Sequence, residues 1–226
     1  MKYQDIIKGR FLSRPNRFIA IAELEGREVV AHVKNTGRCK ELLIPGTGIY
    51  LQHFDRHDRK TAYDLIAVEK NGRIINMDSQ APNKVFYEWA SAGNFIGTPD
   101  LIRPEFKWGN SRFDMYIEKD ERRILVELKG VTLEKNSTAY FPDAPTERGI
   151  KHLKELSHAC AEGYECYVCF IIQMSGINAL RPNYETHPQF GEELRKAADA
   201  GVNIMALDCR VERDSLEIND SIPVLL

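Results

Sequence analysis

In ILVELKG, residues 124–130, two charged residues interrupt a run of strand-forming aliphatic side chains. Burying a charge is costly unless the charge is paired or holds a metal. Side chains alternate between the two faces of a strand, so Val126 and Leu128 point to one face and Glu127 and Lys129 to the other. The stretch therefore predicts a sheet with one apolar face and one face that carries charge.

The preceding segment, SRFDMYIEKDERR, is expected to pair with this strand as a β-hairpin. A tight turn at Asp120 and Glu121 would place Asp114 opposite Glu127, as antiparallel pairing requires. Alternation then gives one uniformly apolar face, made of Phe113, Met115, Ile117, Ile124, Val126 and Leu128.

The charged face of this hairpin has the groups that phosphodiester hydrolysis needs. Carboxylates on adjacent strands, here Asp114 and Glu127, can hold a hard divalent ion such as Mg²⁺ or Mn²⁺, and such an ion activates water. Lys129, on the same face, can orient that water or stabilise charge on the phosphate. The alternative is an ordinary solvated face with a weak surface ion pair.

The composition is that of a globular protein, with 226 residues of which 43% are hydrophobic and 28% charged. No apolar run approaches the roughly 18 residues of a membrane span, and the N-terminus lacks the apolar core of a secretory signal. We therefore expect a cytoplasmic protein without membrane contact. Cys166 and Cys169 lie three apart on an expected strand and face opposite sides, which argues for buried, reduced thiols rather than a metal site.

Charge is distributed unevenly along the chain, whose net charge is −2. That value argues against a protein that coats nucleic acid over its whole surface. Residues 1–80 hold 14 Lys and Arg against 10 Asp and Glu, whereas residues 81–226 hold 17 against 23. The contrast indicates two modules with different tasks, of which the first is the more basic.

Residues 1–80 are dominated by short β-patterned segments between turn signals such as Asn71-Gly72. Strands at this spacing predict a small closed barrel of the OB type, a fold that often binds nucleic acid across one face. The expected strands are RFLSR, RFIAIAEL, REVVAHV, GIYLQHF, TAYDLIAVEK and RIINM.

Residues 81–226 mix helical and strand patterns and predict a mixed α/β sheet with helices packed against it. Val85, Phe86 and Trp89 recur at helical spacing and predict a first helix over 81–93. The other expected elements are strands around 101–108, 111–118, 122–130, 164–174 and 202–211, an extended piece near 138–141, helices around 145–162 and 187–201, and one or two terminal strands.

Asp114, Glu127 and Lys129 form a D-x12-E-x-K pattern that resembles the core of the PD-(D/E)XK nuclease superfamily. The wider sequence is similar to the sugar fermentation stimulation protein A family, members of which carry that core behind an OB-type domain. The matching stretches lie between residues 10 and 176 and are RFLSRPNRFIA, AHVKNTGR, LIPG, SRFD, VELKGVTL, FPDAPTERGIKHLKEL and IIQMSG.

The resemblance implies roles for these residues. It assigns Asp114 and Glu127 to metal binding and all three residues of the pattern to catalysis. Glu88, in FYEWA, resembles the acidic residue that such nucleases often place on the helix before the sheet, so it is either a further metal ligand or an ordinary boundary glutamate. Gln173 ends a later strand and either contacts the site or caps that strand.

Basic residues gather on the barrel around SRPNR and at the start of the helix in FPDAPTERGIKHLKEL. On the barrel they interleave with Phe11 and Phe18, which we expect in its core. Lys34 stands where the family pattern has proline. The start of a helix favours anions, and His152 is expected on its exposed side. The candidate nucleic-acid-binding residues are Arg10, Arg14, Arg17, Lys34, Arg38, Arg148 and Lys151.

These observations support a divalent-metal-dependent nuclease that cuts DNA, or RNA, with little sequence specificity. The alternative is a non-catalytic DNA-binding regulator linked to sugar metabolism, as the name of the family implies. A third hypothesis is an assembly protein whose C-terminal SIPVLL strand pairs between subunits. The sequence leaves the choice between monomer and homodimer open.

Overall fold

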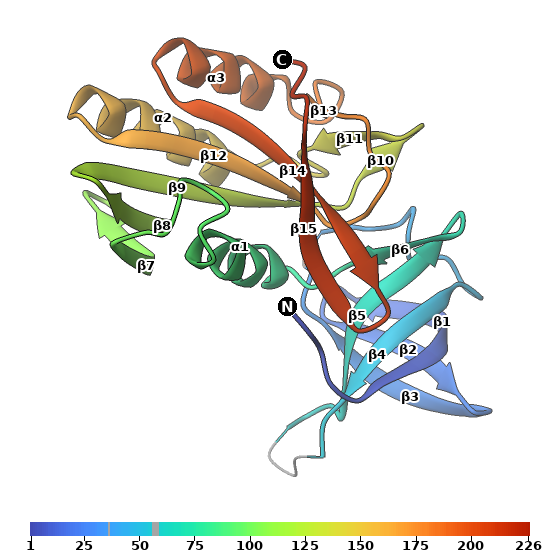
Figure 1. Cartoon of the computed structure of the whole chain (residues 1–226). Coiled ribbons are helices and arrows are strands. Elements are labelled where there is room, and N and C mark those ends of the chain that lie inside the picture. The colour runs from blue at the N-terminus through green and yellow to red at the C-terminus, as the bar shows by residue number, and fades with distance from the viewer. Residues whose placement is uncertain (36, 56–58) are drawn as a thin grey trace.

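The computed structural model describes residues 1–35, 37–55 and 59–226. Figure 1 shows two units, a β-barrel made of the first strands and an α/β unit in which helices cover a sheet. The expected fold class, an OB-like barrel followed by a mixed α/β sheet, is confirmed. In the described residues, no helix has the length and the apolar character that crossing a bilayer requires.

The first unit contains six strands, β1 (Ile6–Asn16), β2 (Ile19–Leu24), β3 (Arg27–Val33), β4 (Gly48–His53), β5 (Tyr63–Lys70) and β6 (Arg73–Asn76). They lie in the order β3-β2-β1-β4-β5-β6, and a pairing of β3 with β5 closes five of them into a barrel. The strand β1 starts earlier than expected because residues 6–10 pair with β4.

The second unit is a six-stranded sheet in the order β15-β14-β12-β9-β8-β7, with three helices. A smaller sheet, β10-β11-β13, lies beside it, and its two outer strands were not expected from the sequence. The elements are α1 (Ala81–Ser91), β7 (Leu101–Trp108), β8 (Ser111–Lys119), β9 (Arg122–Val131), β10 (Glu134–Lys135), β11 (Thr138–Phe141), α2 (Glu147–Ala161), β12 (Glu165–Ile172), β13 (Ala179–Pro182), α3 (Pro188–Asp199), β14 (Asn203–Glu212) and β15 (Ser215–Ile222).

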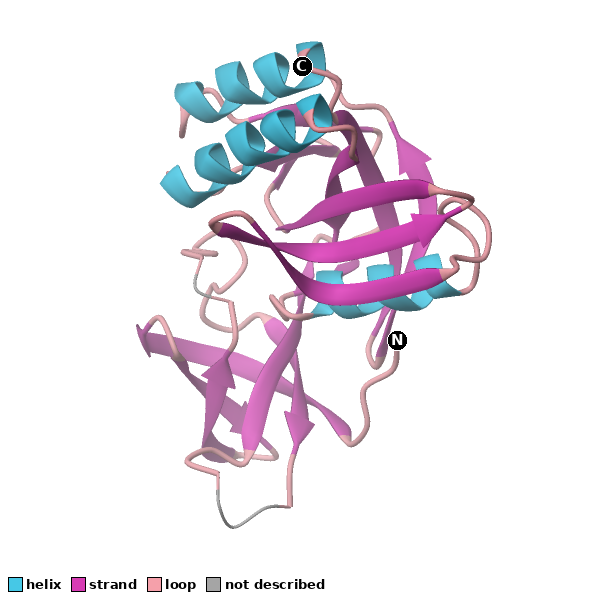
Figure 2. Ribbon diagram, turned by 90° about the vertical axis from the view of Figure 1, so that its left-hand side faces the viewer, coloured by secondary structure: helices cyan, strands magenta, loops and turns pink. Residues whose placement is uncertain are grey.

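Helices cover both faces of the large sheet: α2 and α3 lie together on one face and α1 lies on the other (Figure 2). The hairpin face that was expected to carry charge therefore lies under α2, where Tyr116 and Leu125 are buried with the apolar side of that helix. The alternative of an ordinary solvated face is wrong. Cys166 and Cys169 belong to the clusters on opposite faces, as predicted.

The register of the β8–β9 hairpin agrees with the prediction, since Met115 pairs with Val126 and Ile117 with Ile124. Regular pairing stops there, one residue short of Asp114. Phe113, beyond this break, packs in the cluster under α2 and not on the α1 side as expected. The alternation rule fails at Phe113 because the ladder on which it depends does not continue past Met115.

Gln173 joins the two units and does not line the site. Its side-chain amide donates to Oδ1 of Asn76 at 2.8 Å and to the carbonyl of Asp78 at 2.9 Å. The chain ends are also paired internally: Lys2 bridges to Ser215 of β15, and Leu225 donates its N–H to the carbonyl of Leu180. The C-terminal segment therefore pairs within the chain, and its pairing between subunits stays a prediction.

Candidate active site

A cleft of about 460 Å³ lies where the end of the β8–β9 hairpin meets the first turns of α1 and α2. The three residues of the predicted catalytic pattern, Asp114, Glu127 and Lys129, line it together. The other lining residues are Ser79, Gln80, Asn83, Glu105, Leu128 and Arg148.

Where the pairing of β8 with β9 ends, the carboxylate of Asp114 accepts a main-chain hydrogen bond in place of a strand carbonyl. Its Oδ2 accepts a hydrogen bond from the N–H of Leu128 at 2.7 Å, and its Oδ1 accepts one from Nδ2 of Asn83 at 2.8 Å. Burial, followed by the charge of Glu127, raises the pKa of Asp114 to about 6. The fold thus fixes this carboxyl group close to a second acid that opposes its ionisation.

Glu127 is buried beneath α2, yet it remains a carboxylate. Burial alone would raise its pKa, but hydrogen bonding by His152 and the charge of Lys129 outweigh burial and lower that pKa below its ordinary value. Both partners contact Oε1: Lys129 Nζ donates to it at 2.5 Å, and His152 Nδ1 lies within hydrogen-bonding distance. The other oxygen, Oε2, is buried without a hydrogen-bond partner among the described residues.

This donor set fits a hard divalent cation. A buried carboxylate oxygen without a partner is costly, and a cation beside it would also favour ionisation of Asp114. Within the described residues, no group of three His, Cys, Asp or Glu side chains is arranged as a metal site. The available set is Asp114 and Glu127, which suits Mg²⁺, an ion that usually takes one or two carboxylates and keeps several waters.

Glu88 does not join this pair, which corrects the predicted ligand set. Its carboxylate pairs with the amino group of Met1 at 2.9 Å, its side chain is 45% exposed, and it does not line the cleft. Asn83 is the α1 side chain that reaches Asp114. The helix α1 therefore contributes to the site an amide side chain from its first turn, and not an acidic one.

His152 is the site residue that sequence reasoning missed, because it was expected on the exposed side of its helix. It is buried, and its Nε2 faces Nε of Arg148 at 3.4 Å while its Nδ1 contacts Glu127. One turn further along α2 lies Leu156, which is fully buried. That i, i+4 relation to an apolar residue was the available signal that His152 faces inward.

Two of the predicted nucleic-acid-binding residues serve the fold instead. The guanidinium of Arg14 donates to the carbonyls of Arg17, Asn35, Gly37 and Arg38 and so holds the loop after β3. The ammonium of Lys34 lies 3.3 Å from Asp64 and 3.1 Å from Asp78, both buried. Neither cation is left free for a phosphate.

The other predicted basic residues, Arg10, Arg17, Arg38, Arg148 and Lys151, are exposed. Arg17 lies over the ring of Phe18, with the guanidinium carbon 4.6 Å from the ring centroid. Phe18 is 44% exposed, so the expectation that it belongs to the barrel core is wrong, whereas Phe11 is buried as expected. Of the five, Arg148 lines the cleft itself.

Two family models match the chain: "SfsA N-terminal OB domain" over residues 12–77, and "Sugar fermentation stimulation protein RE domain", a restriction-endonuclease-like domain, over residues 80–215. The chain belongs to the SfsA family. The resemblance inferred from the sequence motifs is confirmed.

Relatives in the SfsA family match this chain over its full length. Two sugar fermentation stimulation protein homologs are 58% identical, from Desulfitobacterium hafniense, and 54% identical, from Clostridium beijerinckii; the match covers 99% and 100% of those chains. The structure of Pyrococcus furiosus SfsA in complex with Ca²⁺ is similar with a TM-score of 0.88 and 28% identity, covering 100% of this chain and 98% of that one.

Arg14→Gln should destabilise the protein far more than Arg17→Gln. The first change removes hydrogen bonds to four carbonyls, of which the two to Arg17 and Arg38 are exposed and can pass to water. A part-buried hydrogen bond from a charged donor contributes about 1.5–3 kcal/mol, and the amide of glutamine replaces part of that contribution. We expect a loss of about 2–4 kcal/mol for Arg14→Gln and under about 0.5 kcal/mol for Arg17→Gln, measured by urea unfolding. Equal losses in the two variants would contradict a structural role for Arg14.

His152→Ala should lower the free energy of unfolding by about 2–3 kcal/mol, because it leaves the buried carboxylate of Glu127 with one partner fewer. His152→Asn can place an amide donor near the position of Nδ1 and should recover about half of that loss. Urea unfolding of the two variants measures the difference. If both variants lose the same free energy, packing of the ring and not its contact with Glu127 sets the stability.

Proposed function

We propose that this protein is a divalent-metal-dependent nuclease that hydrolyses phosphodiester bonds with little sequence specificity. The observation that carries the proposal is the unpartnered, buried Oε2 of Glu127 beside Asp114, whose pKa is raised. Such a pair of acids is poised for a cation, and Lys129 adds a positive group at the same cleft. The restriction-endonuclease-like and OB domains of the family support a nucleic-acid substrate.

Asp114 and Glu127 would hold Mg²⁺ or Mn²⁺, which supplies a water of lowered pKa and polarises the phosphate when bound. The relative from Pyrococcus furiosus was solved with Ca²⁺, which, like Mg²⁺, takes oxygen ligands. That relative supports a divalent-cation site in the family. The orientation of the two carboxylates is fixed by the Leu128 N–H and by His152, so little reorganisation is needed for binding.

Lys129 has the clearest chemical task among the remaining residues. Its side chain is 14% exposed, and its ammonium lies on Glu127 Oε1 at the cleft. From there it can orient the attacking water or donate to a phosphate oxygen as negative charge develops. Arg148, exposed at the rim of the cleft, and the N-terminal end of α1, formed by Ser79 and Gln80, favour the flanking phosphates.

The barrel would contact the nucleic acid through phosphates and one exposed ring. Arg10, Arg17 and Arg38 are exposed, and Phe18 is open for stacking beside Arg17. Arginine next to an exposed aromatic side chain is typical of surfaces that bind single strands without reading their sequence. Binding to DNA or RNA should weaken steeply with salt, because phosphate contacts release counterions.

The name of the relatives favours a second candidate, a DNA-binding regulator of sugar metabolism that does not cut. The two candidates share the barrel surface and differ at the cleft. Cutting requires Asp114, Glu127 and Lys129 to act on a phosphodiester, whereas a regulator needs only affinity. The same set of assays separates them.

Purified protein should cut single-stranded DNA, duplex DNA or RNA with Mg²⁺ or Mn²⁺ and not with EDTA. Asp114→Asn should abolish cutting, and Lys129→Ala should lower its rate by about 10²-fold, the usual loss when one donor to a developing charge is removed. Lys154→Ala, which changes an exposed lysine of α2, should leave the rate unchanged. Cutting that survives in Asp114→Asn and Lys129→Ala would refute this site, and binding without cutting by wild-type protein would favour the regulator.

Metal affinity should depend on pH through Asp114. A carboxyl group holds a cation when it is ionised, and the pKa of Asp114 is raised to about 6. The apparent affinity for Mn²⁺, measured by isothermal titration calorimetry, should therefore be constant above about pH 7 and fall as the pH is lowered through about 6. Asp114→Asn should bind Mn²⁺ weakly at every pH, and an affinity of the wild-type protein that does not change between pH 7.5 and 5 would contradict this assignment.

A further inference from the structure

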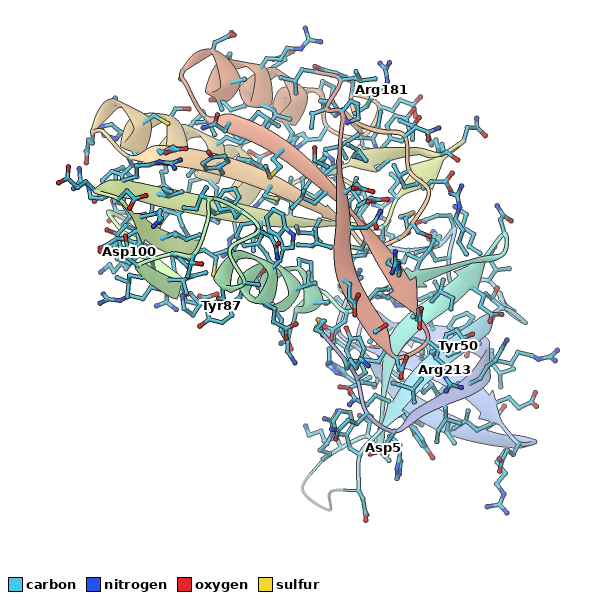
Figure 3. All side chains as sticks on the ribbon, viewed as in Figure 1. Asp5, Tyr50, Tyr87, Asp100, Arg181 and Arg213 are labelled. Carbon is cyan, nitrogen blue, oxygen red and sulfur yellow. The ribbon has the colours of Figure 1, made fainter. Side chains whose placement is uncertain are left out.

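A hollow of about 360 Å³ opens between β13, α3 and the C-terminal residues, outside the barrel and the cleft. Its lining includes the two arginines Arg181 and Arg195 and the rings of Tyr140 and Tyr184. Arg181 shares this hollow with Leu225 and Leu226, and Figure 3 shows it far from Tyr50 of the barrel. The surface around this hollow, called here the Tyr184 surface, belongs to no function derived above.

The charge of the Tyr184 surface contrasts with that of its unit. Residues 81–226 hold 17 Lys and Arg against 23 Asp and Glu, yet Arg181 and Arg195 are exposed and have no ion-pair partner within the described part of the chain. Lys135, at the same hollow, has an exposed partner, Glu185, at 3.0 Å. Two exposed guanidinium groups that form no ion pair, on an acidic unit, favour an anionic partner.

The aromatic rings narrow the class of that anion. Tyr184 is 39% exposed and lies against α3, where a Cβ on Gly191 would come within 2.5 Å of its ring and the guanidinium carbon of Arg195 lies 5.7 Å from its centroid. Lys135 Nζ lies 5.7 Å from the centroid of Tyr140. Cations beside positioned, accessible rings bind single-stranded nucleic acid, since bases stack on the rings while phosphates meet the cations.

A small cavity lies between the residues of the cleft and those of the Tyr184 surface along the chain. Tyr140 lines this cavity of about 50 Å³, whose wall begins at Gly130, the residue after Lys129, and includes Asn35 of the barrel. A strand that ran from the cleft over the mouth of this cavity would reach Tyr140 and then Tyr184. This path uses residues of the second unit, so it lengthens the contact beyond the barrel.

We propose that the Tyr184 surface is a second contact surface for single-stranded nucleic acid, with Arg181 and Arg195 on phosphates and Tyr184 under a base. The proposal rests on the proposed function and extends it to the route of the strand. Duplex nucleic acid does not fit, because its bases are paired and stacked and cannot lie on the ring.

The test measures binding of full-length protein to labelled single-stranded DNA and RNA by fluorescence anisotropy, in EDTA so that nothing is cut. Oligonucleotides of about 30 nucleotides are used, longer than the roughly 4–16 that one OB fold covers. Tyr184→Ala should weaken binding about tenfold, whereas Tyr184→Phe, which keeps the ring, should bind as the wild type does. Duplex DNA should bind equally to all three proteins.

The arginines give an independent readout. The double variant Arg181→Gln and Arg195→Gln should lower the slope of log affinity against log salt by about 1.4, at about 0.7 per phosphate contact on a single strand. A control double variant, Lys154→Gln and Arg210→Gln, removes the same charge at exposed positions of α2 and β14 and should keep the wild-type slope. Circular dichroism checks that each variant is folded. If Tyr184→Ala does not fold, the double arginine variant tests the proposal.

Wild-type affinity and slope in both sets of variants would overturn the Tyr184 surface while leaving the proposed function, which is read from binding and cutting by the wild-type protein. An equal loss of slope in the control variant would also overturn it, because the effect would then be one of net charge. A wild-type protein that binds no nucleic acid in these assays would overturn the proposed function and this surface together.

Discussion

The carboxylate of Glu127 is the buried charge on which the arrangement of the site depends. Its residue is 3% exposed, and an isolated carboxylate in such a place would cost several kcal/mol. The chain offsets this cost by bringing Lys129 from the same strand and His152 from α2 onto one oxygen. Both partners contact Oε1. The interaction that stabilises the fold therefore leaves the second oxygen, Oε2, without a hydrogen-bond partner among the described residues.

The contact between His152 and Glu127 requires a particular position of α2 on the sheet. Thr146 caps the helix by accepting the N–H of Gly149 at 3.0 Å, and a Cβ on Gly149 would come within 3.1 Å of Phe190 of α3. The glycine therefore lets the two helices approach at the first turn of α2. With that turn fixed by its cap and by its neighbour, His152 follows one turn later, directly over Glu127. Thr146 and Gly149 of the sequence TERG, residues 146–149, thus help to position α2 over Glu127.

Local rules predicted the hairpin and the approach of Asp114 to Glu127, because alternation and a tight turn involve residues close in sequence. The pairing of Met115 with Val126 follows from the position of the turn alone. The same rules could not show that α2 covers this face, since that depends on packing between elements far apart in the chain. For this reason His152 was predicted on the exposed side of its helix. Phe113 was assigned to the wrong face of the sheet because strand pairing ends beside it.

The basic residues show a second limit of prediction from sequence: the presence of a cation does not reveal which group it binds. Arg14 and Arg17 flank the same turn, yet only Arg14 is enclosed by carbonyls, and those belong largely to a loop about 20 residues away. Lys34 was likewise assigned to a phosphate, whereas the fold brings it between two buried aspartates. The tertiary structure separates the cations that hold loops from the cations that face solvent, a separation that the sequence could not give.

The same distinction, applied to the acids, supports the cleft as the proposed site. Asp64 and Asp78 are as deeply buried as Glu127, but Lys34 lies between them and neutralises part of their charge. Within the residues described by the structure, Oε2 of Glu127 is the one buried carboxylate oxygen that has no hydrogen-bond partner. Buried acids that serve stability alone are expected to have all their acceptors occupied. An oxygen left unpaired next to Asp114, on a carboxylate that the fold keeps ionised, is the condition that a bound cation would satisfy.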